Sequence, residues 1–465
     1  MKKFLFVLCA IIIGLSAHAQ NFNKEINLNT GFSKTTVNDT IHFTLMPPYY
    51  NGYIAIAATN GKQFTIDWGD GSEIETKTGT GNLEEISHNY GYDTIDYTVT
   101  ITGITADCLF PKLFFHQIFS LIDLDVSACK SLESLTFDEC RNIHSLDLSN
   151  NKALKYLGCS QMPISSLDLS SNKALTILGC SQTQITSLDL SNNPALMQID
   201  CHRSQINSLD LGNNTALETL YCWESKITSL DLRNNTALVN LWCSNNYISS
   251  LELGSNTTLM DLVVCENNQL PLSNLYNIAQ KLNNSQQVFL GRQTLPSQTV
   301  EINEPVDYSD QKEFGGIATV FTVQKDGVPA TSSDYTILDG IFTFKTHGNY
   351  KIIMTNAAIG YDTEVVVNFI VPLGISKHTQ DEINVIVYPN PTTGELIIEN
   401  GSLNLIQGKI ENVEVFDVYG RKISSHHLII SSSHHKINIS HFPAGVYIVK
   451  ILTEEGVFVK KIIKK

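Results

Sequence analysis

The sequence predicts a mainly β protein in which a solenoid of stacked coils is flanked by small β-sandwiches. Two observations support this fold class. An apolar pattern returns every 21 residues through the middle of the chain, and a fixed period of this size identifies a repeat architecture. The segments on either side alternate apolar and polar residues between turns rich in Gly, Pro, Asn and Asp, as short antiparallel strands do.

The central repeat reads L-x-x-L-x-C-x-x-x-x-I-x-x-L-D-L-x-x-N-x-x, and a looser copy begins at Leu132. The leading leucines of the regular copies are Leu154, Leu175, Leu196, Leu217, Leu238 and Leu259. One coil of 21 residues cannot bury its own apolar face. Neighbouring coils must therefore stack and share one continuous core.

This unit resembles the leucine-rich repeat, and its short cysteine-containing form is similar to the internalin-J-like repeats of surface proteins of Bacteroidetes. The resemblance covers residues 121–270. It implies a leucine-rich-repeat solenoid whose cysteine-bearing half forms the binding sheet. With its flanks, the predicted fold is a leucine-rich-repeat solenoid between immunoglobulin-like β-sandwich domains.

Alternation along a strand predicts that the fourth-position leucine and the sixth-position cysteine of each repeat point inward. The expected inward column is Phe137, Cys159, Cys180, Cys201, Cys222, Cys243 and Val264. Because Phe and Val take the same position at the two ends, we interpret the cysteines as reduced packing residues. Whether Cys108, Cys129 and Cys140, near the first coil, form a disulfide is left undecided, since a secreted protein can contain one.

The outward positions three, five and seven differ between repeats, which predicts that they contact a partner. We expect Tyr221, Trp223 and Trp242 to lie side by side on adjacent strands and to form the centre of a ligand-binding face. The residues expected at its rim are Tyr156, His202 and Arg203. The alternative interpretation is that these rings cover one another or dock on a neighbouring domain.

The second half of the repeat is nearly uniform, which predicts a structural role. Its outward columns are Ser145, Ser166, Ser187, Ser208, Ser229 and Ser250, and Asp125, Asp147, Asp168, Asp189, Asp210, Asp231 and Glu252. Stacked carboxylates repel one another, so we expect hydrogen bonds from the serines or from backbone amides to offset this. Bound Ca²⁺ is the alternative. The asparagines expected to satisfy turn backbone groups are Asn172, Asn193, Asn214, Asn235 and Asn256.

The N-terminal segment MKKFLFVLCAIIIGLSAHAQ combines two lysines, an apolar run and A-H-A, which predicts a signal peptide over residues 1–19. No later stretch is apolar for long enough to span a membrane, so direct membrane insertion is not expected. The formal net charge is −15. An acidic chain without a basic patch is not expected to bind nucleic acid.

Three blocks near the C-terminus read VIVYPNPTTGELIIEN (385–400), VEVFDVYGRKI (413–423) and FPAGVYIVKI (442–451). Together they resemble the C-terminal sorting domain of the type IX secretion system of Bacteroidetes, which we assign to residues 381–465 after a linker at 374–380. The resemblance implies contact with that secretion machinery. It places the protein outside the cell, either free or on the outer-membrane surface.

The remaining segments are predicted as flanking modules. FTIDWGDGSE (64–73) and SHNYGYDTIDYTVTITG (87–103) resemble the PKD domain, so residues 20–118 are assigned to a PKD-like β-sandwich and the solenoid N-cap. Trp68 is expected in its core and Asp70-Gly71 in a turn. Residues 119–297 form the solenoid, with a capping helix at 272–284. Residues 298–373 form a β-sandwich spacer.

These observations predict a secreted or cell-surface binding or adhesion protein, exported by the type IX system, whose ligand is an extracellular protein or glycan. No G-x-S-x-G or H-E-x-x-H motif occurs, so we expect no enzyme activity, and no cofactor or metal. The alternatives are a structural spacer or surface-layer component, and a secreted hydrolase without a recognisable motif. The ligand's identity, and whether the protein stays attached or is released, are left open.

Overall fold

The computed structural model describes residues 38–47, 53–91, 94–254, 262–282, 288–360, 362–372, 385–400, 410–417, 421–427, 434–453 and 456–465. The expected signal peptide and the expected linker lie outside them. The chain forms two compact units, Met1–Ser297 with Asp307–Val323 and Lys351–Asn368, and Gln298–Val306 with Gln324–Tyr350 and Phe369–Lys465. Among the described helices, none is long and apolar enough to cross a membrane.

The first unit begins with a β-sandwich. One sheet has the strand order β4 (Glu75–Thr78), β3 (Gln63–Asp67), β6 (Tyr97–Gly103), β1 (Thr40–Leu45), β8 (Leu121–Asp125). Every second residue of β1 is buried, as expected for a strand with one face on the core. The facing strands are β2 (Tyr53–Ala57), β5 (Leu83–Ile86) and β7 (Lys112–His116). They continue into the solenoid sheet, because β7 pairs with β2 on one side and in parallel with β9 (Ser134–Asp138) on the other.

The predicted core position of Trp68 in this sandwich is confirmed, with 2% of the residue exposed. Its ring stacks on His88 at 4.9 Å, and its indole nitrogen donates to Glu75 over 2.7 Å. The carboxylate of Asp70 forms hydrogen bonds with nearby residues. Its Oδ2 lies 2.7 Å from His88 Nε2, and its Oδ1 accepts the backbone N–H of Ser72. Hydrogen bonding from the Ser72 side chain, from His88 and from the Ser72 backbone lowers the pKa of Asp70.

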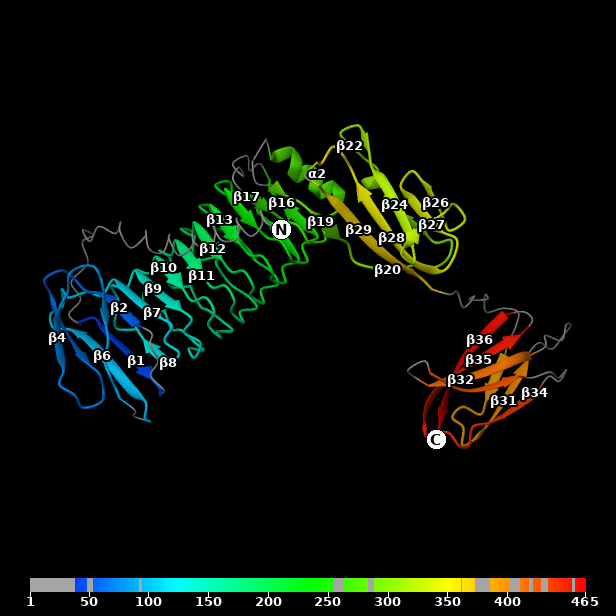
Figure 1. The fold of residues 1–465 in the computed structure, drawn as a ribbon, viewed down its shortest axis with the longest axis horizontal. Helices are drawn as coiled ribbons and strands as arrows, with labels where there is room; N and C mark the ends of the chain where they lie inside the picture. Colours follow the sequence, from blue (N-terminus) through cyan, green and yellow to red (C-terminus); the bar gives the residue numbers. More distant parts are fainter. Residues whose placement is uncertain are drawn as a thin grey trace. The chain divides into compact units, whose positions relative to one another are not determined.

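The solenoid sheet is a parallel ladder (Figure 1). After β9 it contains β10 (Tyr156–Gly158), β11 (Ile177–Gly179), β12 (Gln198–Asp200), β13 (Thr219–Tyr221), β15 (Asn240–Trp242), β17 (Leu262–Val264) and β18 (Val288–Phe289). On the aspartate side of the coils, β14 (Ser229–Asp231) pairs with β16 (Ser250–Glu252). The side that carries the cysteines is therefore the principal sheet, as predicted.

The inward columns are confirmed, with one correction at the last coil. The cysteines from Cys159 to Cys243 are fully buried. The column then continues to Cys265, and the expectation of Val264 at that position is wrong. Trp242 pairs with Val264, 22 residues further along the chain, because the last coil is one residue longer than the others. That extra residue moves Val264 to the outer face of the sheet.

All nine described cysteines are free and buried, including Cys108, Cys129 and Cys140, for which a disulfide was left open. Burial raises the pKa of the Cys159 thiol to about 12, and that of Cys265 to about 12. A thiol in this environment stays protonated and behaves as a small apolar side chain. The interpretation of the ladder as packing residues is confirmed.

The uniform asparagines form a buried hydrogen-bond ladder, as predicted. Asn193 Nδ2 donates to the backbone oxygens of Leu169 (3.0 Å) and Asn172 (2.9 Å) in the preceding coil. The same pattern occurs at Asn151, Asn172, Asn214 and Asn235. Asn256 lies outside the described residues. Each coil is thereby joined to the one before it by side-chain amides as well as by the sheet.

The uniform aspartates accept hydrogen bonds from the backbone two residues ahead. Asp189 Oδ1 accepts from the N–H of Ser191 over 2.9 Å, and Asp231 Oδ1 from that of Arg233 over 3.1 Å. Equivalent bonds occur at Asp125, Asp147, Asp168 and Asp210. Backbone amides thus offset the carboxylate repulsion, as expected. In the part of the chain that the structure describes, no group of three acidic, His or Cys side chains could hold a metal ion.

The helix α2 (Leu272–Lys281) follows the last coil and buries Leu272, Leu275 and Ile278. Next come β19 (Arg292–Thr294), β20 (Gln298–Thr299), β21 (Pro305–Asp307), η1 (Ser309–Gln311), β22 (Glu313–Phe314), β23 (Ile317–Ala318), β24 (Val320–Lys325), β25 (Val328–Pro329), β26 (Tyr335–Leu338), β27 (Ile341–Phe344), β28 (Gly348–Thr355) and β29 (Glu364–Val371). The main sheet has the order β19-β29-β28-β24-β25, and β20 also pairs with β29. A second, three-stranded sheet has the order β21-β27-β26.

The C-terminal domain is a two-sheet β-sandwich. One sheet contains β30 (Val385–Tyr388), β31 (Glu395–Asn400) and β34 (His434–Asn438), and the other β33 (Lys422–His427), β32 (Ile410–Asp417), β35 (Gly445–Thr453) and β36 (Gly456–Lys464). The PNPTTG loop holds the end of the chain. Thr392 N–H donates to Ile463, and Lys465 N–H donates to Thr392.

Candidate ligand-binding face

The outer face of the solenoid sheet carries one column that changes along the solenoid. The strand registers place Gly158, Gly179, Asp200, Tyr221, Trp242 and Val264 side by side. The first coils therefore present glycine where the later coils present bulky side chains. A Cβ on Gly158 would lie 3.1 Å from Cγ2 of Thr136 on the neighbouring strand β9, so that side chain uses the space that the glycine leaves.

His202, Trp223, Trp242 and Tyr221 form a continuous ring assembly, which we call the aromatic stack. The His202 ring lies parallel to Trp223, with centroids 3.8 Å apart and planes 6° apart. Trp223 stacks on Trp242 at 4.5 Å, and Tyr221 meets Trp223 edge-on at 5.9 Å. Stacked and edge-to-face contacts are favoured aromatic geometries, so each ring of the assembly packs well against the next.

Polar groups fix both ends of the aromatic stack. His202 Nδ1 lies 2.6 Å from Asp200 Oδ1, and the Trp242 indole N–H donates to Ser244 Oγ over 2.6 Å. Burial, and the nearby charge of Asp200, raise the pKa of Tyr221. The tyrosine hydroxyl therefore remains neutral at physiological pH. It is available to donate a hydrogen bond.

The expectation that both tryptophans face solvent is wrong. Trp223 is 6% exposed and Trp242 is 3% exposed. Each ring is covered by its neighbours in the stack and by the apolar residues beside it, which include Leu262 and Val264. For these two tryptophans the alternative interpretation applies, because their rings cover one another. Tyr221 is only partly buried at the edge of the cluster.

The exposed part of this face lies at the turn after each strand. The sequence pattern did not predict the geometry of this turn. Arg203 and Glu224 occupy this turn in neighbouring coils, with φ angles of 53° and 53°. Arg203 Nε donates to Glu224 Oε2 over 2.7 Å, and the two side chains are 52% and 42% exposed. The other residues with positive φ at this turn are Glu139, Gln161, Gln182, Asn245 and Asn267. Without glycine at the turn, the repeat gave no signal of this geometry.

The structure thus unites five of the six predicted site residues and places the sixth further along the sheet. Tyr221, Trp223, Trp242 and His202 form the aromatic stack, and Arg203 follows His202 directly at the turn. Tyr156 lies on β10, two strands before β12, and is half-buried. Burial and the charge of Asp200 raise its pKa, so its hydroxyl also stays neutral.

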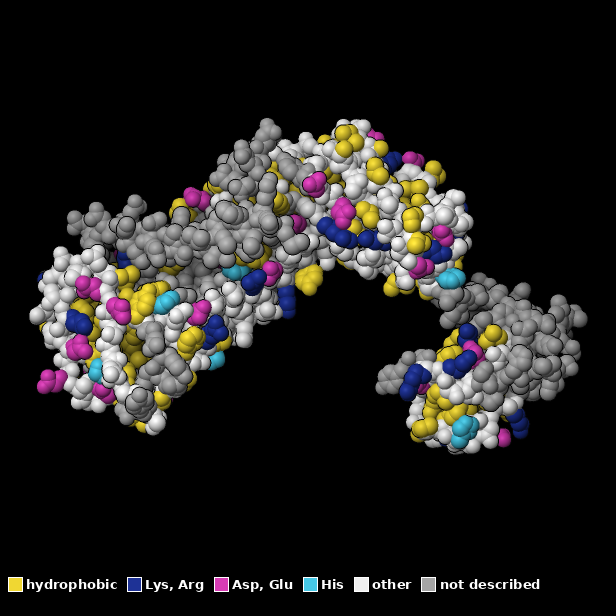
Figure 2. Space-filling model, viewed as in Figure 1, with side chains coloured by type: hydrophobic (Ala, Val, Ile, Leu, Met, Phe, Trp, Pro, Cys, Tyr) yellow, Lys and Arg dark blue, Asp and Glu magenta, His cyan; other side chains and the backbone are white. Residues whose placement is uncertain are grey.

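Charged side chains of both signs are interspersed on the described surface in view (Figure 2). The local pairs follow the same pattern. Lys155 lies 3.0 Å from Glu133, and Arg233 lies 2.6 Å from Asp231. The Arg233–Asp231 pair is exposed and contributes little to stability, whereas the Glu133 side chain of the other pair is buried.

Comparisons with known proteins agree with the C-terminal motifs. Residues 386–465 match the family described as the secretion system C-terminal sorting domain. The chain is similar to the functional domain of InlJ from Listeria monocytogenes, which includes a cysteine ladder, with 20% identity over 53% of this chain and 69% of that chain, at a TM-score of 0.28.

The chain is also similar to InlP from Listeria monocytogenes, with 18% identity over 53% of this chain and 76% of that chain, at a TM-score of 0.36. For the leucine-rich-repeat protein LIC12759 of Leptospira interrogans the identity is 21% over 37% and 50% of the two chains, at a TM-score of 0.28. A search of curated protein sequences gave no match. The protein is a secreted or surface-attached β-solenoid protein whose residues 386–465 match the sorting domain of the type IX secretion system.

Proposed function

We propose that this protein is a binding or adhesion protein that presents the outer face of its solenoid sheet to an extracellular protein or glycan. The observation that carries the proposal is the contrast within each coil. The aspartate side repeats the same side chains in the same hydrogen bonds, whereas the sheet side gathers the aromatic stack next to exposed charged residues. Variation confined to one face is expected of a recognition surface.

The structure supports different roles for the predicted residues. The buried rings of Trp223 and Trp242 form a fixed base, and Tyr221 extends from that base toward the surface. Arg203 supplies an exposed guanidinium in the adjacent turn. We assign direct contact to Tyr221 and Arg203, with His202 and Tyr156 at the edges. A base that is already ordered reduces the entropy lost on binding.

A structural spacer is the second candidate function. The observation that favours it is the burial of both tryptophans, since rings that cover one another need no partner. The two candidates differ in a single respect. Only a binding protein requires exposed Arg203 and the solvent-facing part of Tyr221, which is partly buried at the edge of the aromatic stack. The proposal assigns no catalytic role to any residue.

The test is a binding screen with the full chain against arrays of extracellular proteins and glycans. The matched variants are Arg203→Ala/Tyr221→Ala on the sheet side and Asn192→Ala/Asn213→Ala on the aspartate side, whose asparagines are exposed. We expect the sheet-side variant to lose at least about tenfold in affinity, as when a hot-spot pair is truncated. The other variant should bind as the wild type does. Equal binding by all three proteins, with circular dichroism unchanged, would leave the spacer as the better account.

A further inference from the structure

The outer face of the solenoid sheet has a bare position at Gly179 of β11. The strand registers place this residue between Gly158 and Asp200. Gly179 does not have a positive φ, and a Cβ on it would have no atom nearer than 3.7 Å apart from its chain neighbours. Neither the backbone nor the packing therefore requires glycine here. A glycine inside a strand weakens it, and it often marks a place where a ligand approaches the backbone closely.

The surroundings of Gly179 differ on its two sides. The space at Gly158 is already filled, because a Cβ there would lie 3.1 Å from Thr136 Cγ2 and 3.4 Å from Tyr156 Cε1. The Tyr156 ring therefore borders Gly179 on this side, and Asp200 borders it on the other. Tyr156 and Gly179 are both partly exposed. We call this bare stretch of backbone, between an aromatic ring and a carboxylate, the Gly179 site.

The carboxylate of Asp200 retains an oxygen for a further partner. Asp200 is 6% exposed, and its two hydrogen bonds both use Oδ1. The donors are the backbone N–H of His202 over 3.4 Å and its Nδ1 over 2.6 Å. In the described part of the chain, Oδ2 accepts no hydrogen bond. The charge extends over the face, since burial and then the charge of Asp200 raise the pKa of Tyr156 and of Tyr221.

The basic side chains of the neighbouring coils are engaged elsewhere. Lys155 lies 3.0 Å from Glu133, and Arg203 lies 2.7 Å from Glu224. A neutral imidazole that donates its Nδ1–H leaves the charge of Asp200 in place. The Gly179 site is therefore negative and has no lysine or arginine of its own to balance it.

We propose that the Gly179 site binds a lysine or arginine side chain of a protein partner. This inference rests on the proposed function and narrows it to a protein that presents a basic residue. The charged end pairs with Asp200, and the aliphatic stem lies on the bare backbone of Gly179. The ring of Tyr156 lies beside the stem and can interact with the cation. A side chain at position 179 would occupy the path of the stem, which accounts for the glycine.

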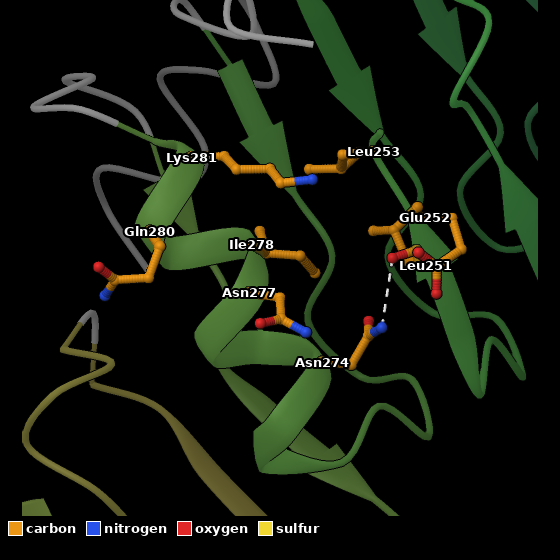
Figure 3. A pocket seen from close by; sticks show the side chains of 8 residues that line it. All are labelled: Leu251, Glu252, Leu253, Asn274, Asn277, Ile278, Gln280 and Lys281. Carbon is orange, nitrogen blue, oxygen red and sulfur yellow. Dashed lines mark hydrogen bonds between the residues drawn. The ribbon is translucent and has the colours of Figure 1, made fainter. Parts of the chain in front are cut away.

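The hollow of about 270 Å³ between β16 and α2 has different properties (Figure 3). Its apolar residues Leu251, Leu253 and Ile278 are 1–3% exposed, so it offers no apolar surface to a ligand. Glu252 and Lys281 contribute one charge of each sign. Because Glu252 is exposed and lies on the other ladder of the solenoid, it provides a matched carboxylate for a control.

The test uses the full chain and saturation-transfer NMR with four capped peptides, Gly-Ser-Lys-Ser-Gly and its arginine, glutamate and leucine counterparts. We expect only the lysine and arginine peptides to bind, with dissociation constants in the millimolar range. Gly179→Val fills the site, and Asp200→Asn removes its charge but keeps an oxygen acceptor for His202. Each should weaken binding at least about tenfold. Glu252→Gln removes the same charge elsewhere and should bind as the wild type does.

A second filling variant separates blocking from misfolding. Gly179→Ala adds only the Cβ for which the structure has room, so its melting temperature should equal or exceed that of the wild type. Its affinity for the lysine peptide should still fall. A lower melting temperature would show that the fold itself requires this glycine, and the proposal would fail.

Three further results would overturn the proposal. These are no signal from either basic peptide, unchanged binding by Gly179→Val or Asp200→Asn, and an equal loss in Glu252→Gln, which would indicate unspecific attraction to an acidic protein. The array screen separates this inference from the proposed function. A partner that is lost by Arg203→Ala/Tyr221→Ala but kept by Gly179→Val and Asp200→Asn would support the binding face and exclude the basic side chain at the Gly179 site. A partner that all these variants retain would count against both.

Discussion

The two sides of each coil solve the same stacking problem in different ways. On the aspartate side, every coil repeats the bonds of its neighbour, with an asparagine amide reaching back to the preceding coil and an aspartate accepting a backbone N–H. On the sheet side, the parallel registers supply the backbone bonds, which leaves the outward side chains free to vary. Uniform columns therefore hold the coils together, whereas the outward positions of the sheet side can vary without loss of those bonds.

The largest effect is expected where the variable side has become part of the core. Trp223→Ala removes a 6% exposed ring that touches His202, Tyr221 and Trp242, so the solenoid should lose about 3–5 kcal/mol of stability. Urea unfolding followed by circular dichroism measures this. Trp223→Phe, which keeps an aromatic ring, should lose less. A loss below about 1 kcal/mol would mean that the aromatic stack is a surface feature after all.

The next effect tests the uniform side. Asn193→Ala removes two hydrogen bonds to the preceding coil and should cost about 2 kcal/mol. Its exposed neighbour provides the control, since Asn192→Ala should change stability by no more than about 0.5 kcal/mol. Both can be measured in the same urea titration. Equal effects of the two substitutions would show that the asparagine column does not join the coils.

The cysteine column lies between the two sides, and its thiols should not react with alkylating reagents in the folded protein. Burial raises the pKa of each ladder thiol, from Cys159 through Cys265, so these groups remain protonated and inaccessible at pH 8. Iodoacetamide should leave all nine described cysteines unmodified in the native protein and alkylate all nine after unfolding in urea. Mass spectrometry reads both states. Rapid native labelling would contradict a packed ladder, and thiols that remain blocked after unfolding would indicate disulfides.

The smallest effect is expected on the stability of the protein at low pH. Hydrogen bonds from Ser149, Ser170 and Ser191 lower the pKa values of Asp147, Asp168 and Asp189 in the folded state. Because the folded pKa lies below the unfolded value of about 3.9, their stabilisation is present above that pH and is lost as pH falls through the folded pKa. Asp168→Asn/Asp189→Asn keeps an oxygen acceptor without titrating. The melting temperature of this variant should fall less between pH 5 and pH 2 than that of the wild type, and identical profiles would exclude these carboxylates as the cause.

The solenoid could be predicted from the sequence because the same residue types return every 21 residues at positions with the same structural role. Leucine at the fourth position and cysteine at the sixth fit only an inward column. The asparagine and aspartate columns carried enough information to predict their backbone bonds. The error at Val264 arose because the last coil is one residue longer, and a fixed period of 21 cannot register an insertion.

The candidate site was less accessible to prediction. Alternation indicated that Trp223 and Trp242 lie on the outer face, but it cannot say how large rings on adjacent strands bury each other. The turn residues Arg203 and Glu224 were missed as a pair, because their left-handed backbone is imposed by the stacked coils rather than by their own preference.

The most direct test of the central claim is a hydrogen-exchange footprint of the protein bound to a partner found in the array screen. It compares protection in residues 198–204, 219–225 and 240–246 on the sheet side with that in 187–192, 208–213 and 229–234 on the aspartate side. We predict that binding slows exchange on the sheet side and leaves the aspartate side unchanged. Protection confined to the aspartate side would contradict the assignment of the sheet face as the recognition surface.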